Sequence, residues 1–157
     1  MPLVWAMHRD PEVTKFIPGP WSDPERHEAF VRERIEATFG YGLGYWSVFQ
    51  HEHPDLSLGW ILLIPTDNIN SEVEIGWRFN RSAWGKGYAT EAAKAILDCA
   101  LETLDLDGVI ADIDPEKFGS IHVAAKIGMT DEGLQECDGD GPSRVFRAWR
   151  DTTASAE

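Results

Sequence analysis

The hydrophobic pattern of the chain changes period several times, and each change marks a predicted element. Between Ser22 and Gly40, apolar and aromatic residues recur at four-residue steps, which is typical of an amphipathic helix. Ser22 opens this segment and Glu25 stands in the capping-box position, so the helix is predicted to run as far as Gly40. Three segments rich in aromatic and β-branched residues follow, separated by the turn sequences HEHPD and PTDNIN, and predict three consecutive antiparallel strands: 45–50, 57–64 and 72–80.

A helical period returns in the second half of the chain. From Ala89 to Leu104 the apolar residues follow this helical period, with small residues in the first part and large residues in the last, and the sequence LDLDG ends the helix. Three further elements are predicted after it, a short buried strand, a second helix closed by Gly128 and a last alternating strand: 109–114, 120–128 and 143–150. The mixture of helices and mainly antiparallel strands predicts an α+β fold.

Composition narrows the class of protein. The 157 residues fit one domain, predicted to span 1–150, and the polar stretch 151–157 reads as a tail. The net charge of -13 disfavours a nucleic-acid partner or an anionic membrane and favours a cationic substrate. The start of the chain has no signal-peptide pattern, and the longest apolar run, WILLI, is too short to span a bilayer, so a cytoplasmic protein is expected.

A pair of glycines precedes the helix that begins near Ala89. In the sequence NRSAWGKGYATEA, the order strand, Gly-x-Gly and helix start lets successive backbone N–H groups point into one concavity. Such a loop favours a pyrophosphate, because a Cβ at Gly85 or Gly87 would hold phosphates off, and Lys86 adds a mobile cation. A P-loop would need Ser or Thr in place of Gly87, and a dinucleotide fingerprint would need glycine at Thr90, so both fit badly.

The stretch EIGWRFNRSAWGKGYATEAAKAIL, followed by DPEKFGSIHVAAKIGM, resembles the GNAT acetyltransferase superfamily, and within it the branch of bacterial ribosomal-protein N-terminal acetyltransferases. The resemblance covers nearly the whole chain. It implies a mixed, mostly antiparallel central sheet with helices on both faces, in αβα layers, and acetyl-CoA as co-substrate. The family normally begins with a strand before HRDPEV; here that strand is either missing or replaced by PLVWA in a shortened form.

The family's cofactor-binding positions can be carried over one by one. Its R/Q-x-x-G-x-G/A loop, which holds the pyrophosphate, falls on 84–89, and the end of its fourth strand, whose backbone pairs with the pantetheine arm, falls on 79–81. Lys117 stands where the family's Asn is usual, and its ammonium could reach a phosphate instead. The resemblance thus implies these cofactor-binding residues: Phe79, Asn80, Arg81, Trp84, Gly85, Lys86, Gly87, Tyr88, Ala89, Thr90 and Lys117.

Acetyl transfer to an amine needs a base for the ammonium and a proton for the leaving thiolate. The resemblance puts an acidic residue at the strand position of Glu74, and strand alternation places it on one face with Glu72 and Arg78. The alternative for this face is an exposed polar surface with an ion pair. Ser120 matches the residue proposed as the acid in this branch, although it could also be the N-cap of the second helix, and Tyr88 and Tyr45 are alternative acids, each of which can equally be a packing residue.

No metal site is expected from the sequence. His51 and His53 lie in the HEHPD turn, and Cys99 and Cys137, the latter in a polar loop, have no metal or redox spacing. We therefore expect an acetyl-CoA-dependent N-acetyltransferase acting on a primary amine, either a protein N-terminus or a small cationic amine. A non-catalytic CoA-binding module and a nucleotide-binding oxidoreductase or kinase are the alternatives, and the resemblance also suggests a homodimer.

Overall fold

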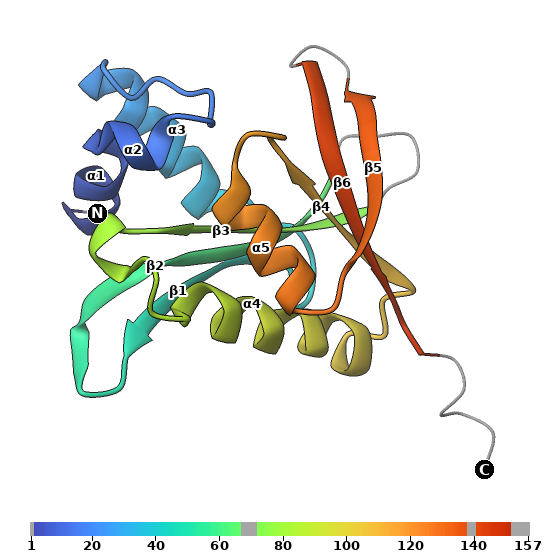
Figure 1. Ribbon diagram of the computed structural model, residues 1–157. Coiled ribbons are helices and arrows are strands. Elements are labelled where there is room, and N and C mark those ends of the chain that lie inside the picture. Colours follow the sequence, from blue (N-terminus) through green and yellow to red (C-terminus); the bar gives the residue numbers. More distant parts are fainter. Residues whose placement is uncertain (1, 67–71, 138–140, 152–157) are drawn as a thin grey trace.

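The computed structural model describes residues 2–66, 72–137 and 141–151, which form a six-stranded sheet with helices on both of its faces (Figure 1). The sheet order is β1-β2-β3-β4-β6-β5. The elements are α1 (Pro2–Arg9), α2 (Pro11–Thr14), α3 (Pro24–Glu36), β1 (Gly44–Gln50), β2 (His53–Pro65), β3 (Val73–Phe79), the 3-10 turn η1 (Arg81–Ala83), α4 (Tyr88–Asp98), the π-helical turn η2 (Cys99–Thr103), β4 (Gly108–Ile113), α5 (Phe118–Lys126), β5 (Thr130–Cys137) and β6 (Gly141–Trp149).

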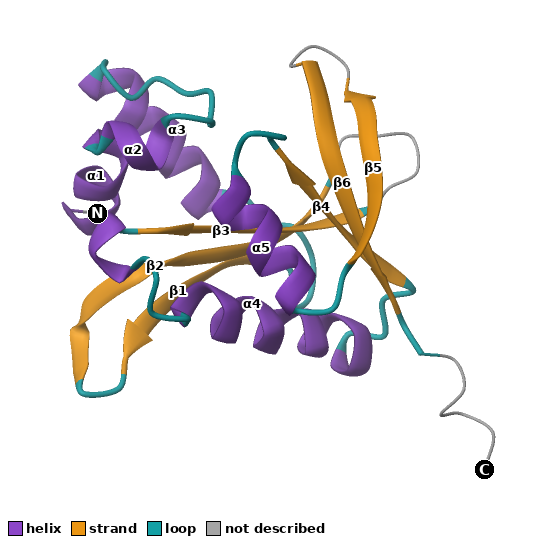
Figure 2. Ribbon diagram, in the orientation of Figure 1, coloured by secondary structure: helices purple, strands orange, loops and turns teal. Residues whose placement is uncertain are grey.

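The sheet has one parallel contact in an otherwise antiparallel order, which confirms the predicted mixed sheet. β3 and β4 run parallel and are paired at Glu74 and Ile110, near the start of β3. Every other neighbouring pair is antiparallel. Figure 2 shows β4 and its partners turning steeply away from the direction of β3, so the two halves of the sheet diverge towards the end of β3. This divergence positions the candidate site described below.

Alternation along β2 and β3 distributes side chains between two helical layers. Ile61, Leu63, Ile75 and Phe79 belong to the main apolar core together with buried alanines of α4 and α5. On the other face, Arg78 contacts His8 of α1 and the ring of Trp21, just before α3. The αβα layering expected from the resemblance is therefore confirmed.

The helix predicted from Ser22 to Gly40 is shorter than expected. Its N-cap is Asp23, whose Oδ1 accepts a hydrogen bond from the Arg26 N–H at 3.1 Å, and Pro24 occupies the first helical position. Ser22 as N-cap was therefore wrong, because proline at the first turn is pre-organised for a helix start one residue later. The helix ends at Glu36, where Ala37 takes an extended conformation.

Two segments differ from the sequence prediction near the chain ends. The residues PLVWA form part of helix α1, so their interpretation as a shortened first strand was wrong. Strand β5 was not predicted, and Cys137, placed in a loop, is its last residue. The β1–β2 hairpin is confirmed with a tighter turn than HEHPD, since β2 already begins at His53.

The remaining boundaries shift by a few residues. The long helix from Ala89 begins at Tyr88, and after Asp98 it continues as the π-helical turn η2 rather than as α-helix. Parts of the PTDNIN turn, the glycine-rich turn before β6 and the tail beyond Asp151 lie outside the described residues. Within the described part of the chain, no helix is long and apolar enough to cross a membrane.

Candidate active site

The loop between β3 and α4 has the backbone that its glycines predict. Gly85 and Gly87 have φ of +70° and +83°, a region that residues with a Cβ adopt at a cost. A Cβ built on either glycine would have no protein atom within 4 Å, so the space above both is open. Gly87 is the N-cap of α4 and offers no side chain, so the first amides of that helix lack an intrahelical partner. The loop therefore fits an anionic group at the positive end of a helix.

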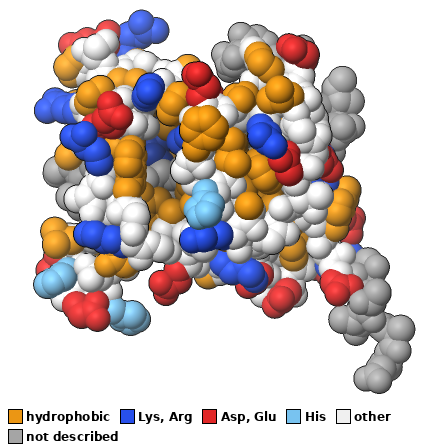
Figure 3. Space-filling model, viewed as in Figure 1, with side chains coloured by type: hydrophobic (Ala, Val, Ile, Leu, Met, Phe, Trp, Pro, Cys, Tyr) orange, Lys and Arg blue, Asp and Glu red, His pale blue; other side chains and the backbone are white. Residues whose placement is uncertain are grey.

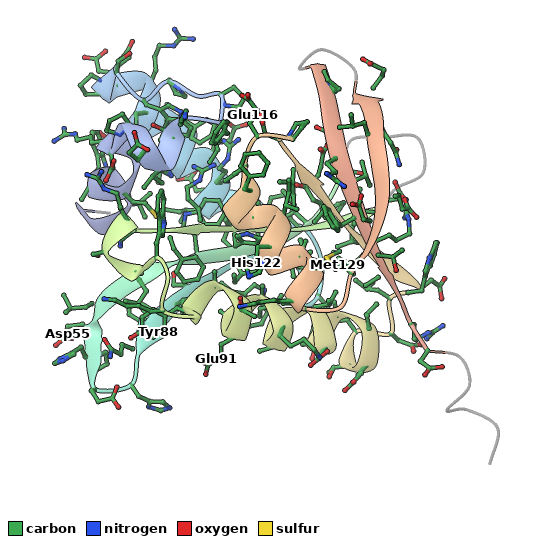
Figure 4. The ribbon with its side chains drawn as sticks, in the orientation of Figure 1. Asp55, Tyr88, Glu91, Glu116, His122 and Met129 are labelled. Carbon is green, nitrogen blue, oxygen red and sulfur yellow. The ribbon has the colours of Figure 1, made fainter. Side chains whose placement is uncertain are left out.

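A cavity of about 600 Å³ adjoins this loop. Trp84, Gly85 and Ala89 line it from the loop and from α4. The opposite wall comes from the segment before α5 and the first turns of that helix, from Glu116 to Val123. Figure 4 shows Tyr88, at the start of α4, and Glu116, just before α5, on either side of β3. Much of the wall of this cavity is apolar, which suits an elongated ligand: Val13, Phe16, Trp77, Phe79, Phe118 and Val123.

A second cavity, of about 200 Å³, holds most of the ionisable side chains of the site. Glu74, Arg78, Asp112, Asp114 and Lys117 line it beside apolar residues of β2. The two cavities share five lining residues and therefore meet at the end of β3: Phe16, Trp77, Arg78, Lys117 and Ser120. A donor molecule in the larger cavity and an acceptor in the smaller one would come together at this junction.

Glu74 is partly buried in the wall of the smaller cavity instead of lying on an open surface. Burial, and secondly the charge of Asp112, raise the pKa of Glu74 to about 7. The alternative of an exposed polar face was therefore wrong, because Glu72, Glu74 and Arg78 are all partly buried, and Glu72 pairs with Arg147 of β6. A carboxyl group with a pKa near neutrality can take up and release a proton under working conditions.

Ser120 lies inside the first turn of α5 and is 8% exposed. Its Oγ accepts a hydrogen bond from Trp77 Nε1 at 3.2 Å. The N-cap position belongs to Lys117, which makes no side-chain capping bond, so the interpretation of Ser120 as an N-cap was wrong. Ser120 therefore faces the junction of the two cavities with its hydroxyl O–H still able to donate.

The two tyrosines considered as alternative acids pack elsewhere. Tyr45 lies against the ring of Trp60, with centroids 5.2 Å apart, and burial raises its pKa. Tyr88 packs against the main core at the start of α4. Neither tyrosine lines either cavity, which leaves Ser120 as the best-placed hydroxyl.

Lys117 brings a cation to the junction. Burial lowers its pKa to about 8, and the charge of Arg78 acts in the same direction, whereas Asp114 opposes it. A lysine held in this way exists partly in its neutral form at mildly alkaline pH, and an anion bound beside it would favour the charged form.

The other residues expected at the cofactor have varied surroundings. Asn80 holds β3 to β2, since its backbone N–H donates to Leu58 O at 2.9 Å and its side chain to Ser57 O at 3.0 Å. Arg81 forms an ion pair of 3.0 Å with Asp10, the N-cap of α2. Lys86 is exposed on the loop. These contacts define the rim of the site, whereas the cavity lining includes five of the predicted positions: Phe79, Trp84, Gly85, Ala89 and Lys117.

Arg78 is the residue whose importance the sequence did not reveal. It lines both cavities and is largely buried, which lowers its pKa to about 10 and leaves it charged at neutral pH. Its Nη1 donates to His8 Nε2 at 2.7 Å, and His8 Nδ1 lies 2.8 Å from His27 Nε2. Its position on the same strand face as Glu74 was the only available signal, and it suggested no more than an ion pair.

The described residues contain no group of three His, Cys, Asp or Glu side chains able to hold a metal ion. Figure 3 shows hydrophobic side chains in several separate patches on this face, and His122 on α5 is exposed to solvent.

Comparison with known proteins identifies the family of this chain. The family model described as "Acetyltransferase (GNAT) domain" matches residues 1–130. The Bacillus subtilis protein YkkB, itself uncharacterized, is 35% identical over 128 residues, which cover 81% of this chain and 73% of YkkB. The crystal structure of a GNAT-family acetyltransferase from Bacillus anthracis matches with a TM-score of 0.75 and 28% identity, covering 93% of this chain and 86% of that one.

A third relative shares the fold at lower identity. Spermidine N-acetyltransferase from Vibrio cholerae, solved in complex with CoA and spermine, matches with a TM-score of 0.72 and 15% identity over 94% of this chain and 88% of its own. The chain belongs to the GNAT acetyltransferase family and is an acetyl-CoA-dependent acetyltransferase.

Proposed function

We propose that the protein transfers the acetyl group of acetyl-CoA to a primary amine, with acetyl-CoA in the larger cavity and the amine in the smaller one. The meeting of the two cavities at Ser120 is the observation that supports this arrangement most strongly. The loop amides around Gly85 and Gly87, together with Lys86, would hold the pyrophosphate, and Lys117 would contact the cofactor at the junction of the two cavities. The apolar walls formed by Trp77, Phe79 and Val123 would hold the pantetheine arm.

Acetyl-CoA supplies the acetyl group as a thioester, and the residues of this chain manage the protons. An ammonium ion entering the smaller cavity meets the carboxyl groups of Glu74, Asp112 and Asp114. Glu74, with its pKa near 7, takes the proton from the ammonium and leaves a neutral, nucleophilic amine. The neutral amine attacks the thioester carbon, and as the C–S bond breaks Ser120 donates its proton to the leaving thiolate and takes up the second proton of the acetylated nitrogen, with Trp77 holding the serine oxygen in place.

The acceptor classes expected from the sequence were a protein N-terminus and a small cationic amine. The smaller cavity carries three carboxyl groups, Glu74, Asp112 and Asp114, beside the cations Arg78 and Lys117, and these carboxyl groups support an acceptor whose amine arrives as a cation. The Vibrio cholerae relative acts on spermidine, which is a small cationic amine, and this makes such acceptors a sensible first panel. Membership of the ribosomal-protein branch, a homodimer and a cytoplasmic location stay predictions.

Thermal unfolding with acetyl-CoA, CoA, NADH and ATP at equal concentration tests the first half of this proposal. A ligand at about one hundred times its dissociation constant stabilises by about 2.7 kcal/mol, which shifts the midpoint of a domain of this size by several degrees. We expect a shift with acetyl-CoA and CoA alone, followed by CoA release when a panel of amines is added. A shift with NADH or ATP instead, or none at all, would contradict the assignment of the larger cavity.

A further inference from the structure

The guanidinium of Arg78 is held rigidly in the wall of the smaller cavity. Its carbon lies 4.8 Å from the ring centroid of Trp60 and 5.3 Å from that of Trp21. Trp21 is itself fixed by a 2.8 Å hydrogen bond from its Nε1 to Ile17 O. Arg78 Nη1 is also bound to His8, so three residues, Trp21, Trp60 and His8, hold the guanidinium of Arg78.

The charge of Arg78 is not neutralised by this environment. Arg78 donates to His8 Nε2, so this nitrogen is an acceptor, and His8 in turn donates through Nδ1 to His27. Both imidazoles are neutral in this arrangement and supply no negative charge. Among the described residues, no salt bridge joins Arg78 to a carboxylate; burial lowers its pKa most, Tyr45 raises it and the second cation Arg34 lowers it.

One edge of the guanidinium has an unmet hydrogen-bond donor. Arg78 Nε is buried and has no hydrogen-bond partner among the described residues. Buried donors are nearly always satisfied, and Nε has less than 1 Å² of accessible surface, so an acceptor from the cavity reaches it only when the neighbouring side chains shift. Nε lies on the same edge as Nη2, and once opened this edge would match the two oxygens of a carboxylate in a bidentate pair. An anionic oxygen acid is therefore the ligand that this wall fits best.

We propose that Arg78 forms an anion-binding subsite of the acceptor cavity, and that the acceptor is a primary amine that also carries a carboxylate. This inference rests on the proposed function, because it concerns the acceptor of the same reaction. The smaller cavity then binds both charged groups of a zwitterion. Glu74, Asp112 and Asp114 bind the ammonium, and Arg78 binds the carboxylate. A polyamine offers Arg78 no negative charge and is the less suitable acceptor.

Pairs of acceptors that differ only by the carboxylate test this directly. We would measure kcat/KM for tryptophan against tryptamine and for lysine against cadaverine, which place the carboxylate near the reacting amine and far from it. The wild-type protein should prefer a carboxylated member by about 10-fold to 100-fold, since a site built to pair a polar group discriminates strongly against its absence. Equal values within both pairs, or a preference for the decarboxylated members, would overturn the proposal without needing any variant.

Substitutions of Arg78 test whether this residue causes the preference for carboxylated acceptors. Arg78→Gln should abolish it by lowering kcat/KM for the carboxylated acceptor alone, and Arg78→Lys should restore little, because lysine keeps the charge without the bidentate edge. Arg32→Gln, an exposed arginine on α3 outside both cavities, is the matched control. A rise in the KM of acetyl-CoA with no change between paired acceptors would show instead that Arg78 serves acetyl-CoA, and would overturn the proposal.

A binding measurement separates this inference from the proposed function. Tryptophan and tryptamine are added to the wild-type protein and to Arg78→Gln in the presence of CoA, and thermal unfolding is followed. Stabilisation of the wild type alone by the carboxylated member, without acetyl transfer to any amine, would support the subsite and contradict the proposed function. Absence of both transfer and stabilisation would contradict both.

Discussion

Trp77 Nε1 donates a hydrogen bond to Ser120 Oγ at 3.2 Å and so ties β3 to α5 where the two cavities meet. The indole is a donor only, so the serine oxygen acts as acceptor in this bond and its own hydrogen stays available. This geometry agrees with Ser120 as the acid that protonates the leaving thiolate. It also gives the residue a structural task, and the two roles can be separated by experiment.

Ser120→Ala should lower turnover by about 10²-fold or more, the usual contribution of a positioned acid. It should also cost about 1–3 kcal/mol in the free energy of unfolding, because the partly buried Trp77 donor loses its partner. Steady-state kinetics and urea denaturation measure the two effects. Ser47→Ala, on the exposed part of β1, is the control. A loss of stability with unchanged turnover would leave Ser120 only the structural role.

Gly87→Ala should weaken acetyl-CoA binding and also strain the backbone. Alanine at φ +83° costs about 1–2 kcal/mol of stability, and its Cβ would enter the open space above the loop. Gly133→Ala is a close control, because Gly133 has φ +84° and an equally open surrounding on β5, away from both cavities. Both variants should lose similar stability in urea, whereas only Gly87→Ala should lose acetyl-CoA affinity by calorimetry. Equal affinity in the two variants would exclude the loop as a pyrophosphate site.

The buried pair His8 and His27, 3% and 1% exposed, should make the protein sensitive to acid. Burial, and secondly Arg78, lower the pKa of His8 to about 3, so the unfolded chain binds a proton below about pH 6.5 that the folded chain refuses. The stabilising contribution of neutral His8 is present above pH 6.5 and is lost as the pH falls towards 3. Between pH 6.5 and 5 the loss should reach about 2 kcal/mol.

Denaturation at pH 5, 6 and 7 checks this effect. The difference in unfolding free energy between pH 7 and pH 5 should shrink in His8→Gln, which does not titrate. It should be unchanged in His122→Gln, because His122 is exposed on α5. An equal pH dependence in the wild type and His8→Gln would show that other groups cause the acid sensitivity.

Features with a local cause were predictable from the sequence. The strands β1 to β3 follow from alternation and turn chemistry, and the loop at Gly85 and Gly87 follows from the need for positive φ before a helix. Strand β5 was missed because its sequence, TDEGLQEC, has little apolar alternation. It pairs with β6 partly through ion pairs of Arg144 with Asp131 and Arg147 with Glu132, which only the assembled sheet creates.

The roles of Glu74 and Arg78 depend on packing that no local pattern encodes. Alternation placed both on one strand face, but whether that face was open or covered depended on α1 to α3. The family's first strand was expected to be either missing or replaced by PLVWA, so the burial of Arg78 by His8 and Trp21 could not be foreseen. The pKa of Glu74 near 7 likewise comes from burial in the folded chain, and secondly from the charge of Asp112.

The most direct test of the account is the pH dependence of kcat/KM for acetyl transfer in the wild type and in Glu74→Gln, with Glu52→Gln in the exposed β1–β2 turn as the control. The wild type and the control should lose activity as the pH falls through about 7, because Glu74 becomes protonated. In Glu74→Gln this step should vanish, with a rate about 10²-fold to 10⁴-fold lower, so that only the ionisation of the acceptor amine remains. An unchanged rate and the same step near pH 7 in all three proteins would contradict Glu74 as the base.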